Sequence, residues 1–510
     1  MPTAPAPEIP DQDLSSFTLE RAGEFGDKPA LIDGPSGRTI TYAQLDGGTR
    51  ALAAALAARG IGKGDVVAIY MPNLPEYALV FHGVIRAGAI NTTANPLYTS
   101  HELAHQLRDS GAKMLFTVGA FLETAREAAA EVGLDPASII VIGESEGDET
   151  NIRDLRDEGE GEPDVEIDPA GDLAVIPYSS GTTGLPKGVM LSHRNLVANI
   201  LQTGGTIPVE DDDVSIGVLP FFHIYGMTVI MNMGLRNGGT IVTMPRFDLE
   251  QFLDLIEEHG VTLSYVVPPI ALALAKHPAV EGRDLSTLRM IMSGAAPLGD
   301  ELARAVADRI DVPTIQGYGM TELSPVTHVA PIDNQKGGSI GPPVAGTECR
   351  IVDPETGEDA DRGELWIRGP QVMVGYLNNE EATRETIDED GWLHTGDVAE
   401  MDEDGHYAIV DRLKELIKYK GFQVPPAELE AILINHPCVA DCAVIGVPDE
   451  EAGELPKAFV VCSGEVTDDE LMEFVAEKVS PQKKVRIIER IETIPKSASG
   501  KILRRELAGK

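Results

Sequence analysis

Apolar runs rich in β-branched residues recur along the chain, and each is followed by turn residues and then by a helical pattern. Val66–Tyr70 precedes Pro75–Ala87, and Met114–Val118 precedes Ala120–Val132. Two further pairs keep this order, Thr262–Val267 with Pro269–Lys276 and Arg289–Met292 with Gly299–Arg309. Strands that lead directly into helices are typical of α/β layers. The sequence therefore predicts an α/β fold.

The pattern changes near Asp411. A basic, glycine-containing stretch up to Gly421 leads into Pro425-Pro426, a helical pattern over Ala427–Asn435 and two strand-like runs, Val439–Gly446 and Ala458–Cys462. About 100 residues remain, which is the size of one small domain. We therefore predict a large N-terminal domain over residues 1–411 and a small α+β domain over residues 412–510. The acidic stretch 144–168 is predicted to be a solvated connection.

Acidic residues outnumber basic ones by 82 to 41, which gives a net charge of −41, and they are spread along the whole chain. Such a field repels a phosphate backbone, so a nucleic-acid partner is not expected. Self-repulsion of this size is relieved when salt screens it, and we expect high intracellular salt as the setting. The alternative is an acidic protein from ordinary conditions that its charge keeps in solution.

The sequence carries no sign of export or of membrane insertion. Its four cysteines do not form a disulfide framework or a C-x-x-C zinc motif. Met1–Pro10 lacks the basic flank and apolar stretch of a signal peptide. The longest apolar run, Val261–Ala275, contains Ser264 and two prolines and is too short for a membrane span. We expect a cytoplasmic monomer or homodimer.

The segment Tyr178–Val189 has a composition suited to phosphate binding. Glycines let the backbone approach phosphate oxygens, serines and threonines add donors, and Lys187 adds a positive charge. Pro186 and Gly188 occupy positions where a Walker A loop needs Gly and Ser or Thr, so P-loop phosphoryl transfer is disfavoured. A flexible linker is also disfavoured, because a strand-like run, Leu173–Pro177, comes directly before it.

Residues 179–189 resemble the signature loop of the adenylate-forming superfamily, which includes acyl-CoA synthetases, 4-coumarate–CoA ligases and firefly luciferase. Further family segments follow in order, from Asn95-Pro96 to the tail motif Pro495–Arg505, so the resemblance covers essentially the whole chain. It implies the fold of these enzymes, in which a large multi-layered domain carries a small mobile C-terminal domain. It also implies ATP, Mg²⁺ and coenzyme A as cofactors or cosubstrates.

The resemblance assigns residues to the nucleotide. The phosphate loop would contribute Ser179, Ser180, Gly181, Thr182, Thr183, Gly184 and Lys187. The segment Gln316–Glu322 is similar to the adenylate-binding loop, with Gly317, Tyr318, Gly319 and Thr321 at the nucleotide and Glu322 as the Mg²⁺ ligand. Asp397 and Arg412 would hold the ribose hydroxyls, and Lys414 would mark the hinge. Taken alone, Asp397 could equally cap a turn.

Two more segments concern the acid and the thiol. Leu219–Gly226 is similar to the aromatic segment beside the carboxylate, which implies a pocket lined by His223, Tyr225, Gly294, Gly319 and Met320. A lone histidine among aromatic residues is otherwise more often a core residue. Lys418, Gly421 and Gln423 match the loop that accepts coenzyme A, although Lys418 could also be a solvated surface lysine. Lys501 matches the catalytic lysine, for which a basic tail is the alternative.

These resemblances imply an acid–CoA ligase that first forms an acyl-adenylate with release of pyrophosphate and then transfers the acyl group to coenzyme A. A carrier-protein module is less favoured, because no carrier domain follows Lys510. A luciferase-like oxygenase and a non-catalytic nucleotide sensor are also less favoured, the latter because Glu322 and Lys501 are both present. For the acid, we favour medium- or long-chain fatty acids, with aryl acids such as 4-coumarate as the alternative.

Overall fold

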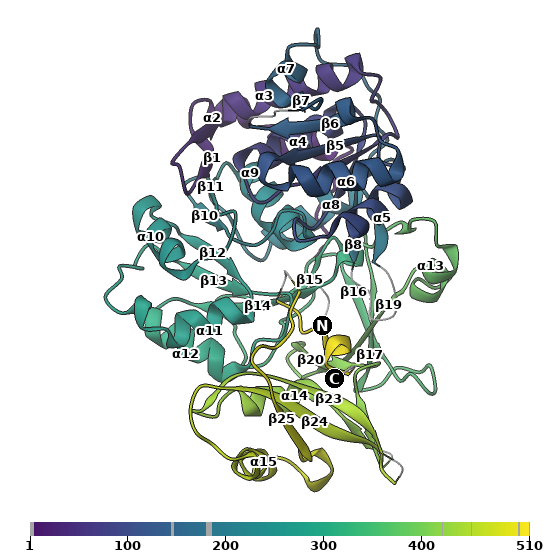
Figure 1. Ribbon diagram of the computed structural model, residues 1–510. Coiled ribbons are helices and arrows are strands. Elements are labelled where there is room, and N and C mark those ends of the chain that lie inside the picture. The colour runs from purple at the N-terminus through teal and green to yellow at the C-terminus, as the bar shows by residue number, and fades with distance from the viewer. Residues whose placement is uncertain are drawn as a thin grey trace.

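The computed structural model describes residues 5–143, 147–179, 186–420, 422–449, 451–497 and 500–508. Figure 1 shows a large part, coloured purple to green, above a small yellow-green part that contains the end of the chain. The large part is built on two eight-stranded sheets and one four-stranded sheet, and the small part on one five-stranded sheet. This confirms the predicted α/β class with a large N-terminal and a small C-terminal unit.

The first sheet runs in the order β18-β9-β8-β4-β3-β5-β6-β7. Its central strands are parallel, and β9 and β18 are added antiparallel at one edge. Its strands are β3 (Val66–Tyr70), β4 (Ile90–Thr93), β5 (Met114–Val118), β6 (Ile139–Ile142), β7 (Thr150–Asn151), β8 (Leu173–Ser179), β9 (Lys187–Ser192) and β18 (Gly375–Tyr376). The predicted strands at 66–70 and 114–118 have these bounds.

The second sheet runs in the order β15-β14-β13-β12-β10-β11-β1-β2 and is also mostly parallel. Its strands are β1 (Pro29–Asp33), β2 (Thr39–Thr41), β10 (Val214–Gly217), β11 (Thr240–Thr243), β12 (Leu263–Val266), β13 (Met290–Ser293), β14 (Thr314–Gly319) and β15 (Val326–Val329). One continuous apolar core lies between the two sheets and their helices, and parallel strands buried within a sheet, such as β3 and β6, are nearly unbroken apolar runs.

The remaining sheets are largely antiparallel. The third contains β16 (Glu348–Val352), β17 (Arg362–Arg368), β19 (Leu393–Met401) and β20 (Tyr407–Arg412). The fourth, in the small part, contains β21 (Ile417–Tyr419), β22 (Phe422–Val424), β23 (Val439–Asp449), β24 (Gly453–Cys462) and β25 (Ile487–Arg490). Residues 413–416 link these two sheets. The domain boundary predicted after residue 411 lies next to this linker and stays a prediction.

The helices fill the faces of the sheets. In the large part they are α1 (Leu14–Leu19), α2 (Ala22–Phe25), α3 (Tyr42–Ala58), α4 (Pro75–Arg86), α5 (Ser100–Ser110), α6 (Leu122–Val132), α7 (Ile152–Arg156), α8 (His193–Gly204), α9 (Met233–Asn237), α10 (Leu249–His259), α11 (Pro268–Lys276), α12 (Asp300–Ile310) and α13 (Glu380–Thr386). In the small part they are α14 (Pro426–Leu433), α15 (Asp468–Ala476) and α16 (Arg504–Ala508). No helix within the described ranges is long and apolar enough to span a membrane.

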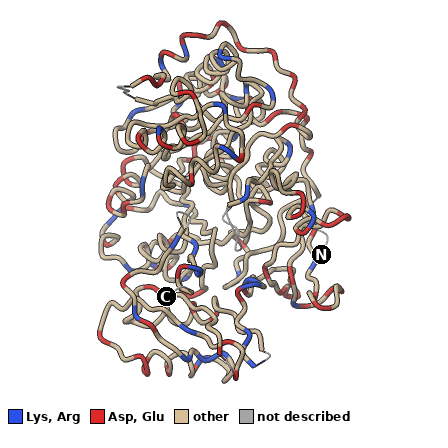
Figure 2. The backbone as a smooth tube through the Cα atoms, turned by 45° about the vertical axis from the view of Figure 1, so that its right-hand side comes forward, with Lys and Arg blue, Asp and Glu red and all other residues tan. Residues whose placement is uncertain are grey.

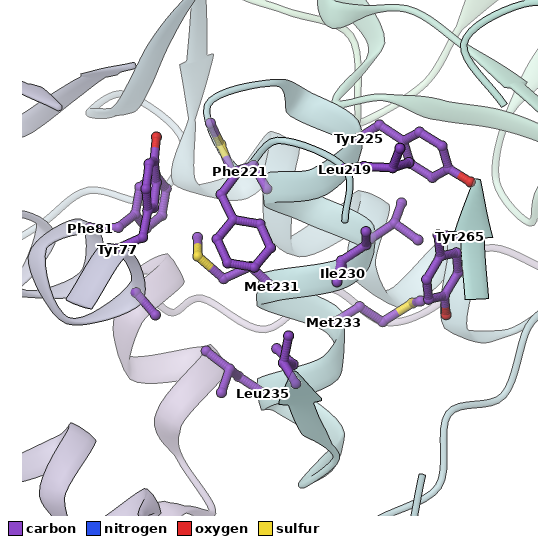
Figure 3. Close-up of a cluster of buried hydrophobic side chains, with 14 of the residues drawn as sticks. Tyr77, Phe81, Leu219, Phe221, Tyr225, Ile230, Met231, Met233, Leu235 and Tyr265 are labelled. Carbon is purple, nitrogen blue, oxygen red and sulfur yellow. The ribbon is translucent and has the colours of Figure 1, made fainter. Parts of the chain in front are cut away.

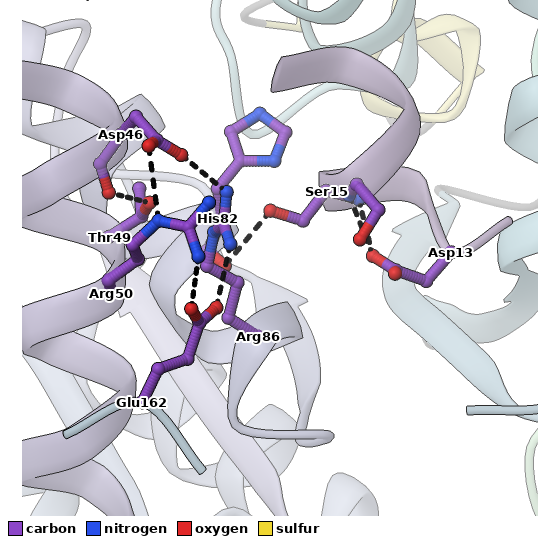
Figure 4. A network of polar contacts seen from close by, with 9 residues as sticks. Asp13, Ser15, Asp46, Thr49, Arg50, His82, Arg86 and Glu162 are labelled. Atoms are coloured by element: carbon purple, nitrogen blue, oxygen red, sulfur yellow. Dashed lines mark hydrogen bonds and ion pairs between the residues drawn. The ribbon is translucent and has the colours of Figure 1, made fainter. Parts of the chain in front are cut away.

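The acidic connection is more ordered than the sequence predicts. It contains β7 and α7, and Ile152 and Leu155 of α7 are buried. Further along, Glu162 accepts a hydrogen bond from Arg86 of α4 at 2.7 Å, and Arg86 also pairs with Asp46 of α3 at 2.6 Å, as Figure 4 shows. The arginine side chain is 8% exposed. This part of the connection is therefore held against α3 and α4 by partly buried ion pairs.

Candidate active site

Glu322 lies where the first two sheets meet, in the short helical turn η5 (Thr321–Leu323) after β14, and is buried. Its Oε1 accepts hydrogen bonds from the Ser179 hydroxyl at 3.0 Å and the Tyr376 hydroxyl at 2.9 Å. Burial and the nearby Glu322 charge raise the pKa of Tyr376, so its phenol remains a donor. The Lys187 ammonium lies 4.7 Å from the centre of the Tyr376 ring. The carboxylate is thus oriented by the ends of β8 and β18.

A second carboxylate, Asp397 of β19, faces Arg412 directly across the β19–β20 pair. Arg412 Nε is 3.2 Å from Asp397 Oδ1, and the Tyr318 hydroxyl donates to Oδ2 at 2.6 Å. Burial raises the pKa of Asp397 above its ordinary value, although Arg412 and Tyr318 act in the opposite direction. A carboxylate offers about four lone-pair positions, so Asp397 keeps acceptor capacity for a diol.

Lys501 lies on a loop that the end of the chain carries up to the large part, seen as the yellow trace near β14 in Figure 1. Ser497 fixes the loop, because its N–H donates to the Lys501 carbonyl at 2.8 Å and its hydroxyl accepts from the Lys501 N–H at 3.1 Å. A Cβ placed on Gly500 would lie 3.5 Å from Val267 and 3.6 Å from Pro269. The loop is therefore in van der Waals contact with the start of α11.

The charge on Lys501 acts on both carboxylates. Burial and the positive charge of Arg412 lower the pKa of Lys501, while Glu322 and Asp397 raise it, and the net direction is downward. Four charged residues, from η5, β19, β20 and the lysine loop, thus lie close enough for their charges to interact. They are Glu322, Asp397, Arg412 and Lys501.

The aromatic segment 219–225 is fixed by a buried amide. Asn73, in the turn after β3, donates to the carbonyls of Gly217 and Leu219 at 2.8 and 2.7 Å and accepts from the Phe221 N–H at 2.7 Å. The carbonyl of Phe222 accepts from the Thr93 hydroxyl at 2.8 Å. The backbone leading to the histidine is therefore anchored to the first sheet.

His223 is a neutral imidazole with a defined tautomer. Burial and the positive charge of Lys501 lower the pKa of His223 to about 3. Its Nδ1 accepts from the Tyr225 N–H at 3.3 Å, which places the ring proton on Nε2. The ring can therefore donate one hydrogen bond through Nε2. The charge of Lys501 acts on this buried ring, and the role of His223 at the acid stays a prediction.

Tyr225 forms a rigid wall two residues after this histidine, and Figure 3 shows it near Tyr265. Its hydroxyl donates to the Met292 carbonyl at 3.2 Å, and its ring meets Tyr265 edge-on, with centroids 6.4 Å apart. A Cβ on Gly294 would lie 2.9 Å from the Tyr225 ring, so glycine is needed for this close approach. The wall begins the π-helical turn η3 (Gly226–Asn232), a type of turn often found at functional sites.

The loop 317–321 borders both carboxylates. Gly317, Tyr318 and Gly319 belong to β14, and Met320 and Thr321 follow, all half-buried. A Cβ on Gly319 would lie only 2.0 Å from the Pro325 carbonyl oxygen, so no side chain fits there. Glycine at this position therefore lets β14 pack closely against the backbone of Pro325.

The residues predicted to accept coenzyme A lie elsewhere. Lys418 and Gln423 face each other across the β21–β22 hairpin, and both are exposed. The Lys418 N–H donates to Glu454 at 2.7 Å. Lys414 is exposed in the linker. The predicted site residues Ser180, Gly181, Thr182, Thr183, Gly184 and Gly421 lie outside the described residues.

With this geometry established, comparison with known proteins identifies the family. Residues 19–377 match the sequence profile described as AMP-binding enzyme, and residues 428–501 match the AMP-binding enzyme C-terminal domain. The chain belongs to the AMP-binding enzyme family. The 4-coumarate–CoA ligase 3 of Oryza sativa subsp. japonica is 46% identical over 97% of this chain and 91% of its own length. The 4-coumarate–CoA ligase 2 of Solanum tuberosum is 46% identical over 97% and 93%.

Solved structures of AMP-binding enzymes superpose on the whole chain. An anthranilate CoA ligase in complex with anthranoyl-AMP matches with a TM-score of 0.92 and 27% identity, covering 98% of both chains. A benzoate CoA ligase from Burkholderia xenovorans LB400 matches with a TM-score of 0.89 and 25% identity, covering 98% of this chain and 100% of its own. These matches confirm the adenylate-forming fold. The protein is an AMP-forming acid–CoA ligase, with ATP and coenzyme A as cosubstrates.

The residues around Glu322 suit a magnesium ion that is shared with a nucleotide. Among the described residues, no group of three or more His, Cys, Asp or Glu side chains forms a metal cage. Mg²⁺ is commonly held by one or two carboxylates together with substrate phosphates. One oriented carboxylate next to the segment predicted to bind phosphate therefore fits this ion.

Three residues that hydrogen-bond to other polar groups in or near this site were not singled out from the sequence: Asn73, Tyr376 and Arg504. Asn73 and Tyr376 lie in segments whose composition alone does not suggest chemistry. Arg504 belongs to the tail motif, but sequence reasoning attached significance only to Lys501. The pairing of β18 with β9 places Tyr376 opposite Val189, the last residue of the segment predicted to bind phosphate. A single sequence does not reveal which strands pair or in what register.

Proposed function

We propose that this enzyme is an ATP-dependent aryl acid–CoA ligase of the 4-coumarate type. The observation that carries the proposal is 45–46% identity, over 97–98% of the chain, to relatives that are 4-coumarate–CoA ligases. Similar structures include ligases for anthranilate and benzoate, which are also aryl acids. These comparisons favour the aryl acid alternative over the fatty acids that the sequence analysis preferred.

The pocket wall is consistent with a planar substrate. The fixed Tyr225 ring lies against Gly294, which places no side chain beside it. A flat ring can stack in such a space without displacing side chains. His223 Nε2–H would donate to a carboxylate oxygen at the entrance, and His223 stays neutral there because its pKa is about 3.

In the first half-reaction, the carboxylate attacks the α-phosphorus of ATP and pyrophosphate leaves. Lys501 and Lys187 would stabilise the negative charge that builds up on the phosphate oxygens, together with the predicted donors Thr182, Thr183 and Thr321. Asp397 would bind the ribose, and Gly317 with Tyr318 would border the adenine. Glu322 would hold Mg²⁺, which supplies charge neutralisation at the phosphates when bound.

In the second half-reaction, the thiol of coenzyme A attacks the acyl-adenylate. We propose that the small domain rotates about the linker at Lys414, withdraws Lys501 and brings Lys418, Gly421 and Gln423 to the acid. The exposure of Lys418 and Gln423 and the engagement of Lys501 support an orientation suited to adenylation.

A panel of acids tests the proposal. Pyrophosphate release and thioester formation are measured with 4-coumarate, cinnamate, benzoate, hexanoate and palmitate, each with and without coenzyme A. We expect the highest kcat/KM for a cinnamate. A higher kcat/KM for a fatty acid would overturn the aryl assignment and restore the alternative.

A further inference from the structure

Arg504 joins three segments of the small domain and its linker. Its Nε donates to Glu415 Oε2 at 2.7 Å, its Nη2 donates to Glu430 Oε2 at 3.1 Å, and its Nη1 donates to Glu430 Oε1. Glu415 lies in the linker 413–416, Glu430 lies in α14, and Arg504 begins α16. One guanidinium thus connects the end of the chain to the linker and to the first helix of the small domain.

The three side chains are only 15–25% exposed. Burial alone would lower the pKa of Arg504, but the charges of Glu430 and Glu415 raise it above its ordinary value. Glu430 is fixed in turn, because its Oε1 accepts from the Val444 N–H of β23 at 2.7 Å. Partly buried charges with several hydrogen bonds hold a defined geometry better than exposed pairs do.

Arg504 lies three residues after Lys501, and the chain between them is constrained. Ile502 forms a bridge with Lys496, and the Leu503 N–H donates to the Pro495 carbonyl at 2.9 Å. Beyond Arg504, Leu507 is fully buried in a small apolar cluster on β23 and β24. The lysine loop therefore projects from a tail whose base is fixed at Arg504.

Glu415 also acts on the site itself. Its negative charge raises the pKa of Lys501 and that of Arg412, although neither residue forms an ion pair with it among the described contacts. The linker carboxylate that holds Arg504 is thus close enough to the catalytic cluster to influence it. If Arg504 moved, Lys501 would move with it, because only two residues separate them in the chain.

We propose that Arg504 is a positioning residue for adenylation: by binding Glu415 and Glu430 together, it fixes the Lys501 loop to the linker, so that the lysine moves with the hinge as one body. The proposal rests on the proposed role of Lys501 in adenylation. It assigns Arg504 no contact with a substrate. A planar guanidinium suits this role better than a lysine ammonium, which keeps the charge but cannot form the forked contact with Glu430 and reach Glu415 as well.

The test uses Arg504→Gln in the full-length enzyme. Acyl-adenylate formation is measured by pyrophosphate release, and thioester formation is measured separately from supplied acyl-adenylate and coenzyme A. We expect the adenylation kcat to fall about 10- to 100-fold, as for a displaced catalytic group, with the KM for ATP and the second half-reaction changed less than about twofold. Arg504→Lys should recover part of the loss. The matched control is Arg490→Gln, which removes the ion pair of Arg490 with Asp468 on the same domain and should change neither half-reaction.

Each result decides the matter. Equal losses in both half-reactions would make Arg504 a purely structural residue and overturn the proposal, as would an unchanged adenylation rate. If Arg504→Gln does not fold, Glu415→Gln is measured in its place, because this substitution removes only the contact between Arg504 and the linker. The same selective loss of adenylation is expected. Without that selective loss the proposal would be overturned. If the single variant Lys501→Ala, with Arg504 unchanged, still forms acyl-adenylate at the normal rate, the proposed function itself would be contradicted.

Discussion

Two lysines of the small domain lie in opposite surroundings. Lys501 is half-buried against the large domain, where Arg412, Glu322 and Asp397 all influence its charge. Lys418 is exposed on the β21–β22 hairpin, where its register partner is the equally exposed Gln423. The two lie on one domain, yet only one of them meets the carboxylates that would bind nucleotide and metal.

The difference supports the proposal that this orientation serves the first half of the reaction. The large domain supplies fixed groups, with Asp397 and Arg412 paired across two strands and Glu322 oriented by two hydroxyls. The small domain supplies a group through a loop that lies against the start of α11. Fixed binding groups and an exchangeable charged group together favour the proposed alternation, in which the lysine at the site changes between steps.

The largest effect that would sharpen this comparison is expected for Lys501→Ala. Loss of one group that stabilises developing charge typically costs about 10²–10³-fold in rate. We expect a loss of this size in pyrophosphate release, with conversion of supplied acyl-adenylate to thioester retained. Stopped-flow measurement of each half-reaction checks this. Parallel loss of both steps would remove the distinction between the two lysines.

The next effect concerns the fixed side of the site, with Asp397→Asn. The substitution keeps the shape but removes the charge that pairs with Arg412 and accepts from Tyr318. Hydrogen bonds to charged groups contribute about 1.5–3 kcal/mol, so we expect the KM for ATP to rise roughly 10- to 100-fold. Isothermal titration with ATP provides an independent reading. An unchanged ATP affinity would make Asp397 a structural residue of the β19–β20 pair.

A smaller effect is expected for Lys418→Ala. An exposed side chain that meets the substrate only after rotation should lower thioester formation about tenfold, equivalent to one hydrogen bond, and leave adenylation unchanged. Lys420→Ala on the same hairpin is a suitable control, since Lys420 pairs with Glu451 at its surface. Slower adenylation in Lys418→Ala would mean that both lysines act in one orientation.

The sequence predicted those parts of the fold whose pattern is local. Strands β3 and β5 and helices α4 and α6 follow from apolar runs and flanking turns, since a parallel strand buried on both faces is a short continuous apolar run. The third sheet escaped prediction, because its strands alternate in burial and pair over long separations. The π-helical turn after Tyr225 was not predicted either. An apolar run does not show which backbone carbonyl will accept a hydrogen bond from each of its backbone N–H groups.

The site follows the same division. Glu322, Asp397, Arg412 and Lys501 could be named from motifs, and the structure brings them together. The groups around them could not, because they act between segments distant in sequence. Tyr376 orients Glu322, Asn73 holds the backbone before His223, and Glu415 binds Arg504. The acidic connection was wrongly expected to be a solvated loop throughout, since a high charge count does not show that Ile152 and Leu155 share a buried face.

The smallest effect sharpens the contrast between buried and dispersed charges. Acidic residues lie over all parts of the backbone in Figure 2, and their mutual repulsion should be screened as the Debye length falls from about 10 Å at 0.1 M to about 3 Å at 1 M salt. Buried pairs such as Asp397 with Arg412 are screened much less. We expect the thermal midpoint and the activity to rise together from 0.1 M to molar KCl, measured by calorimetry and turnover. If the protein is most stable in dilute buffer, the predicted high-salt setting would be contradicted, and the ligase assignment would not be affected.

The central claim is that the contact of the Lys501 loop must open between the half-reactions, and a reversible cross-link tests it most directly. A Cβ on Gly500 lies 3.6 Å from the Val267 Cβ, within the range of about 3.5–4.5 Å found in disulfides. The double variant Val267→Cys, Gly500→Cys is measured oxidised and reduced, with Gly500→Cys alone as the control for the positive φ of that glycine. We predict that the oxidised enzyme forms acyl-adenylate but not thioester, and that reduction restores the second step. Thioester formation at the reduced rate while the disulfide is intact would contradict the account.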